Sequence, residues 1–233
     1  MSTAKKIGAV LAPKIPQLAP NLSAAFVHQA LDKAIVGVGP LPSAASAADK
    51  QLAENDGDLE RGTHDVIENH VRYAGLQGFV TNIGGLVTMA FTVPTNITGL
   101  ALIQCRMVAG IVHLRGYDLA DPRTRAAILT CLLGEDRITK LVKDRTLPGT
   151  PMELASAQVF DSSLNALLAN EVAAELITRA AGKRLATTVG RRVPVVGGVV
   201  GAGTDAYVTW KIGRYVDREF LPRSPGGKRK KRK

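Results

Sequence analysis

Apolar residues recur at spacings of three and four along most of the chain, which is the period of an amphipathic helix. The first helix is expected to start with Asn21 as its N-cap and to end near residues 37–40. Residues 41–57 are rich in Ser, Ala, Asn and Asp and predict a linker or a weak helix. The chain before about residue 58 is therefore expected to be peripheral, with an extended arm over residues 1–20.

The next part of the chain loses its charges abruptly. Upstream of Arg72, charged and apolar residues alternate at helical spacing. The inward-facing candidates there are Val66, Ile67, Val71 and Leu76. Between Arg72 and Arg106 no residue is charged, an interval long enough to cross a bilayer as one straight helix. Because Pro94 interrupts it, the pattern predicts two shorter apolar helices, over 75–92 and 95–115, each marginal or too short to span alone.

Small residues line one face of the first apolar helix and recur in the last helix, which is expected from Pro194 to about Phe220. Such faces let a neighbouring helix approach closely, in membranes and in tightly packed bundles alike. The glycines predicted to pack against helices or to face a membrane are Gly78, Gly84, Gly85, Gly197, Gly198 and Gly201.

The remaining elements are ordinary amphipathic helices. A helix capped by Asp121 is expected to end at Gly134, and a short charged helix covers residues 135–145. A Pro/Gly loop follows over residues 147–151, and a long amphipathic helix then ends near Gly182.

These elements predict an all-α fold, a compact multi-helix bundle with two Gly-rich apolar helical regions, a flexible N-terminal arm and a basic C-terminal tail. Residues 193–200 could form a buried strand, but no second alternating run offers it a partner. The expected division is an N-terminal arm, helix and linker over 1–57, a helical domain over 58–221 and a disordered tail over 222–233.

Composition adds two constraints. Hydrophobic residues make up 45% of the chain but aromatic residues only 4%, so the core must be built from aliphatic side chains. Of the net charge of +10, six charges come from the tail; without them 24 basic residues stand against 20 acidic ones. The tail residues are Lys228, Arg229, Lys230, Lys231, Arg232 and Lys233. The tail would attract phosphate on nucleic acid or on anionic lipid, unless it is only a solvated end.

The cysteines and the N-terminus bear on the compartment. Cys105 and Cys131 lie in apolar helical patterns and resemble small core residues, which is typical of a reducing compartment. The apolar run at residues 7–12 is interrupted too early for a secretory signal. A cytoplasmic location is expected, with peripheral attachment at the inner face of the plasma membrane as an option.

The sequence contains only weak matches to phosphate-binding and metal-binding motifs. Gly198 and Gly203 have the spacing of a phosphate-binding loop, but Thr204 and Asp205 stand where Lys and Ser or Thr should follow. His64, Glu68 and His70 could suggest a metal site, but a solvated His–Glu pair explains their spacing better. No cofactor, metal or catalytic residue is therefore predicted.

Four other polar residues are the first to inspect for a hidden reaction centre. Glu171 and Glu175 share one helix face, which is expected to be the solvated side of that helix. Arg106 and His113 lie two turns apart in an otherwise apolar helix. A buried Arg106 needs a carboxylate or carbonyl partner, and Asp118 or Asp205 could supply it.

Several glycine-centred segments, in this order, resemble the EcsC family of bacterial proteins over about residues 60–220. They are Ala74–Phe79, Gly84–Gly85, Leu114–Asp118, Asp121–Pro122, Arg192–Gly198 and Ile212–Tyr215. Asp205 stands where the family commonly has Asn, whereas the residues that match the family pattern are Gly116, Tyr117, Asp118, Pro194, Gly197, Gly198 and Gly201. The resemblance implies no catalytic residue, because members have no established activity. It does imply a bacterial, membrane-linked setting, since the family takes its name from a protein encoded beside an ABC transporter.

The leading hypothesis is a non-enzymatic accessory protein that associates peripherally with the cytoplasmic membrane or a membrane transport complex. Its expected partners are an anionic lipid surface or a membrane protein complex. The alternatives are a soluble helical binding module whose tail contacts nucleic acid, and an enzyme with a cryptic site. The sequence leaves homo-oligomerisation open.

Overall fold

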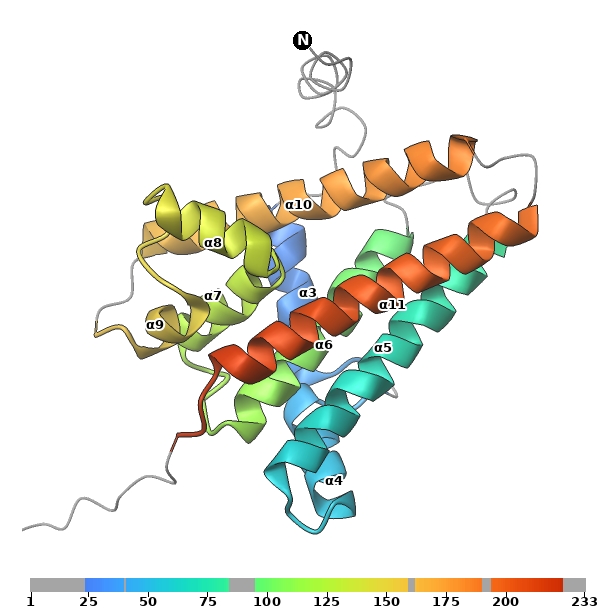
Figure 1. Ribbon diagram of the computed structural model, residues 1–233. Coiled ribbons are helices and arrows are strands. Elements are labelled where there is room, and N and C mark those ends of the chain that lie inside the picture. The colour runs from blue at the N-terminus through green and yellow to red at the C-terminus, as the bar shows by residue number, and fades with distance from the viewer. Residues whose placement is uncertain (1–23, 40, 84–94, 159–161, 190–193, 224–233) are drawn as a thin grey trace, which may run out of the picture.

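The protein is a bundle of α-helices (Figure 1). The computed structural model describes residues 24–39, 41–83, 95–158, 162–189 and 194–223. These residues form nine α-helices and no β-strand, so the all-α prediction is confirmed. The helices are α3 (Ala24–Val36), α4 (Ala44–Glu54), α5 (Leu59–Ile83), α6 (Thr95–Leu114), α7 (Pro122–Cys131), α8 (Glu135–Lys143), α9 (Pro151–Ser156), α10 (Ser162–Val189) and α11 (Pro194–Glu219).

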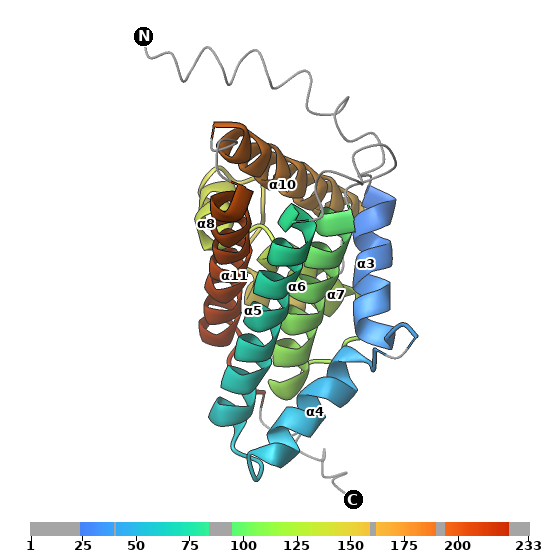
Figure 2. The same cartoon turned by 90° about the vertical axis from the view of Figure 1, so that its right-hand side faces the viewer.

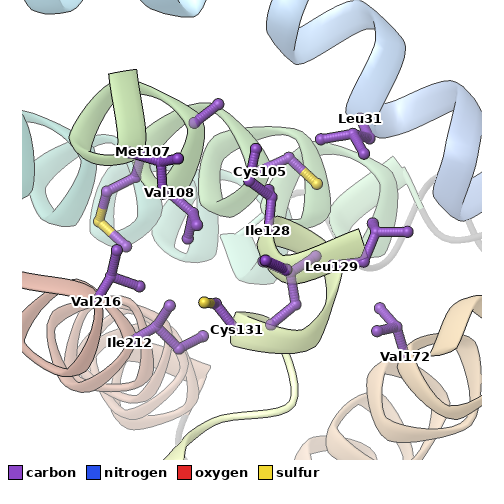
Figure 3. Close-up of a cluster of buried hydrophobic side chains, with 14 of the residues drawn as sticks. Leu31, Cys105, Met107, Val108, Ile128, Leu129, Cys131, Val172, Ile212 and Val216 are labelled. Atoms are coloured by element: carbon purple, nitrogen blue, oxygen red, sulfur yellow. The ribbon is translucent and has the colours of Figure 1, made fainter. Parts of the chain in front are cut away.

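Helix α6 lies at the centre, with α3, α4, α5 and α11 packed around it (Figure 2). Its residues from Cys105 to Val112 are all buried, as its nearly uniform apolar character predicts. The core is aliphatic, and Figure 3 shows Val108, Ile128 and Leu129 among its members. Cys105 and Cys131 lie there too as free, fully buried thiols, which confirms their prediction as core residues.

Helices α5 and α11 lie side by side and run in opposite directions (Figures 1 and 2). Gly213 allows their close approach, because a Cβ atom there would lie 3.0 Å from Ile67 Cγ2 and 3.1 Å from Met107 sulfur. Gly110 similarly brings α6 near α4, with a Cβ position 3.4 Å from Ala48 Cβ. The described part of the bundle therefore uses glycine for close packing at positions other than those predicted.

The expectation that the chain before residue 58 is peripheral is wrong for α3 and α4, the described helices of that part. Leu31 and Ala34 of α3 are 0% exposed, and Ala44 and Ala48 of α4 are 1% exposed. Residues 44–54 form a full helix, and Ser43 caps it by accepting a hydrogen bond from the Ser46 backbone N–H at 3.1 Å. The small alanine side chains on one face of α4 let it approach α6 closely. Hydrophobic periodicity does not reveal such a contact between distant segments.

Several helix boundaries also differ from the predictions. Helix α10 continues through Gly182, because one glycine costs only about 1 kcal/mol in a helix and the residues after it favour helix. Leu76 was expected to face inward but is 62% exposed. Helix α9 was not predicted, although Thr150 and Glu153 form a capping box at its start. The predicted break at Pro94 lies outside the described residues.

The other helices match their predictions closely. Asp121 caps α7 by accepting from the Arg123 backbone N–H at 2.8 Å, and Pro122 occupies the first turn. Helix α6 covers nearly the whole of the predicted 95–115 segment, and α11 starts at Pro194 as expected. A strand over residues 193–200 is excluded from Pro194 onward, since that part of the chain is helical.

Candidate functional site

The glycines chosen for packing or membrane contact remain a prediction. Gly84 and Gly85 lie outside the described residues. Gly78 falls within α5, and Gly197, Gly198 and Gly201 fall within α11, but their surroundings are not described. The basic tail, Lys228 to Lys233, also lies outside the described residues.

Arg106 and His113 both bind the N-terminal part of the chain. The Arg106 side chain donates from Nη1 to the Pro42 carbonyl and from Nη2 to the Ser43 carbonyl, the latter at 3.5 Å. His113 Nε2 lies 2.8 Å from Asp49 Oδ1. The two residues therefore hold α4 against α6.

The predicted ion pair of Arg106 with Asp118 or Asp205 is wrong. Backbone carbonyls, which the sequence does not single out, take the place of a carboxylate. Asp118 instead accepts from the Ala120 backbone N–H at 2.9 Å, just after α6. Asp205 is 1% exposed within α11.

The segment 115–118 ends α6. Gly116 has φ +84°, a left-handed conformation that glycine adopts without strain, and its N–H donates to the His113 carbonyl at 2.8 Å. The Tyr117 ring then packs edge-on against Phe220, with ring centroids 5.1 Å apart, and the Arg223 guanidinium lies 4.1 Å from its centroid. These pattern residues join the end of α6 to the end of α11.

Glu171 and Glu175 belong to surface ion pairs. Glu171 accepts from Arg137 of α8 at 2.8 Å, and Glu175 accepts from Arg179 at 2.9 Å. Since the α6 pair described above binds different partners, the four residues proposed for inspection do not form one constellation.

Burial sets the pKa values of the two cysteines in the core. Burial raises the pKa of the Cys105 thiol to about 12, and it raises that of Cys131 well above its ordinary value, so neither forms a thiolate readily.

His64 is exposed and lies 3.7 Å from Glu68. Within the described residues, no group of three or more His, Cys, Asp or Glu side chains could hold a metal ion.

His70 is the buried titratable group with a testable consequence. Its Nδ1 donates to the Val66 carbonyl at 2.7 Å, and its Nε2 has no hydrogen-bond partner among the described residues. Burial lowers the pKa of His70 from 6.5 to about 4, partly offset by that hydrogen bond, and nearby Arg106 lowers it further. The folded state therefore keeps the imidazole neutral.

We expect the free energy of unfolding to fall by roughly 3 kcal/mol as the pH drops from 6.5 to 4. In that range the unfolded chain binds a proton at His70 that the folded chain does not, so acid favours unfolding. Urea denaturation at several pH values measures this slope. His70→Gln should flatten it, whereas the exposed control His64→Gln should keep it; equal slopes in all three proteins would refute the assignment.

Two exposed aromatic side chains lie together on α11, and we call Tyr207 and Trp210 the aromatic surface. Their exposed fractions are 59% and 48%. The rings of Tyr207 and Trp210 stack, with centroids 6.2 Å apart and an interplanar angle of 21°. Tyr73 and Leu76 of α5 are also exposed, at 56% and 62%, but the Tyr73 ring lies beside buried His70, with ring centroids 6.0 Å apart.

A polar cleft lies next to the aromatic surface, where α5 begins and α11 ends. It has a volume of about 680 Å³ between the start of α5, the end of α6 and the last turns of α11. Arg115 and Arg214 both line it and share one carboxylate: Asp217 Oδ1 accepts from Arg115 Nη2 at 2.5 Å, and Oδ2 accepts from Arg214 Nη1 at 3.2 Å.

Sequence reasoning missed this cleft. Arg115 and Arg214 lie inside two of the family segments, Leu114–Asp118 and Ile212–Tyr215, but neither arginine was predicted as a site residue. The recurrence of an arginine beside a glycine in both segments was the available signal.

Comparison with known proteins identifies a family for the chain. None of the helices in the described ranges combines the length and the apolar character needed to cross a bilayer. No curated protein and no solved structure is significantly similar to the chain. A model of the EcsC protein family matches residues 2–223, and this match includes α3 and α4, which the quoted segments left out. The chain therefore belongs to the EcsC protein family.

Proposed function

We propose that this protein associates peripherally with an anionic membrane surface, with the aromatic surface in contact with lipid and the basic tail providing electrostatic attraction. The observation that carries the proposal is the stacked, solvent-exposed pair of Tyr207 and Trp210. In a chain whose residues are only 4% aromatic, two exposed rings stacked on each other call for an explanation outside the core.

The chemistry of these side chains suits the membrane interface. Tyr and Trp combine an apolar ring with a polar group and are enriched at the level of lipid headgroups. Beyond the end of α5, residues 84–93 contain no charge, so the sequence that continues from this helix is also compatible with a lipid boundary.

The charges support an anionic surface in particular. The chain carries a net charge of +10, and six consecutive basic residues form its end. Lys211 follows Trp210 directly and pairs with Asp136 at 3.1 Å. A basic residue near an anionic bilayer contributes about 1 kcal/mol, and this attraction falls with salt.

Co-flotation with vesicles tests the proposal. Full-length protein should float with vesicles of phosphatidylcholine and phosphatidylglycerol at low salt. The double variant Tyr207→Ser and Trp210→Ser should reduce the partition coefficient at least about tenfold, because it removes two interfacial rings. Replacement of residues 228–233 by Gln should weaken binding and remove most of its salt dependence.

Leu167→Ser is the matched control, since Leu167 is 38% exposed on α10, away from the aromatic surface. It should bind like the unaltered protein. Equal flotation of the Tyr207/Trp210 double variant and this control would overturn the proposal. Binding of duplex DNA without vesicle binding, abolished by the tail replacement alone, would instead favour a soluble module with a nucleic-acid-contacting tail.

A further inference from the structure

At the base of the polar cleft, two guanidinium groups share one of its three carboxylates. The Arg115 side chain is 9% exposed, and Asp217 is its one anionic partner among the described residues. The same carboxylate also serves Arg214, so two guanidinium charges share one negative charge. The Arg115 Nε–H has no hydrogen-bond partner within the described part of the chain. A buried guanidinium with an unused donor is costly, which favours a further acceptor at this place.

The walls of the cleft add a third guanidinium and further polar groups. Arg61 of α5 lies on its rim, 78% exposed, where its contact with Asp58 at 3.4 Å is a weak surface pair. His64 lines the same side, with carboxylate oxygens no closer than 3.7 Å. These groups have donors to offer a ligand without giving up a buried partner.

Two carboxylates complete the lining and restrict the ligand. Asp65 accepts from Asn55 at 2.8 Å, and Glu60 lies at the start of α5. Every side chain that lines the cleft is polar or charged, so an apolar ligand would gain nothing there. A ligand with an anionic group for the arginines and a hydroxyl-bearing part for the carboxylates fits the whole lining.

We propose that this cleft binds a phosphate group on a polar carrier, with Arg115, Arg214 and Arg61 as its ligands. Arginine suits this role because its planar fork matches two phosphate oxygens at once. Phosphate fits better than a single carboxylate, because three guanidinium groups need more than two acceptor oxygens. The cleft adjoins the aromatic surface, because Arg214 lies one helical turn after Trp210 on α11, so titration with soluble probes is needed to test the cleft apart from lipid contact.

Calorimetric titration of the full chain with inorganic pyrophosphate and with glycerol 3-phosphate tests the site. Arg214→Gln should raise the Kd about tenfold, and the pair Arg61→Gln with Arg214→Gln should raise it further. Arg218→Gln is the matched control: it lies on α11, removes the same charge and pairs with Glu135 outside the cleft. The tail is identical in all variants, so its own attraction for phosphate cancels.

Circular dichroism must show that Arg214→Gln folds, which is expected because Arg214 is 42% exposed. A second arm measures flotation with phosphatidylglycerol vesicles. If Arg214→Gln weakens flotation as well as titration, the phosphate belongs to a lipid headgroup; if it weakens only titration, the ligand is a free phosphate compound. Equal Kd values for Arg214→Gln and Arg218→Gln, or no binding of either soluble probe by the unaltered protein, would overturn the inference. Failure of the Tyr207/Trp210 test would leave it standing.

Discussion

Asp217→Ala is expected to lower the free energy of unfolding by about 3 kcal/mol or more. The carboxylate of Asp217 accepts from Arg115 at 2.5 Å, and the Arg115 side chain is only 9% exposed. Without Asp217 the guanidinium keeps its charge but loses its counter-ion, and an uncompensated buried charge costs about 3 to 5 kcal/mol. Urea denaturation followed by circular dichroism measures the loss.

Two further variants make this prediction specific. Replacing both partners, with Arg115→Met and Asp217→Leu, should recover a large part of the stability, since no charge is then left buried. Glu171→Ala removes a carboxylate from the partly exposed pair with Arg137 and should cost no more than about 1 kcal/mol. A double variant as unstable as Asp217→Ala would show that the loss has another cause.

Leu129→Ala should destabilise the protein by about 2 to 5 kcal/mol. Leu129 is 0% exposed in α7, within the cluster shown in Figure 3. Truncation to Ala removes apolar contacts and leaves a cavity that the surrounding helices fill only in part. The midpoint of urea denaturation reports the change.

The same substitution at Leu167 is the control, because that side chain is 38% exposed on α10. Its truncation should cost less than about 1 kcal/mol. If Leu167→Ala costs as much as Leu129→Ala, the cluster around α7 does not form the core that the burial pattern indicates.

Local signals in the sequence were sufficient for much of the fold. Helix α6 is apolar on nearly all sides, and its predicted range of 95–115 differs little from the observed one. Asp121 and Pro122 mark the start of α7 because a capping side chain and a proline have a defined place in the first turn. Such signals act within a few residues, so one sequence displays them.

The errors arose where distant parts of the chain decide the outcome. Helix α4 is rich in alanine, and only its contact with α6 shows that this small face is buried. The partners of Arg106 are backbone carbonyls before α4, which no side-chain pattern reveals.

The polar cleft was missed for the same reason. Its residues come from the turn at Asn55, from α5, from the end of α6 and from α11. Neither charge counting nor motif spacing brings such separate segments together. Resemblance to a family found two of the segments, but it assigned no role to Arg115 or Arg214.

The contact between Ile67 and Gly213 has a consequence for how the protein is made. The two residues are 146 positions apart (213 minus 67), so the part of α5 that packs against α11 stays uncovered until α11 leaves the ribosome. At 5 to 20 residues per second this delay lasts roughly 7 to 30 s. During that time the nascent chain exposes apolar surface, so we expect a ribosome-bound chaperone to bind it.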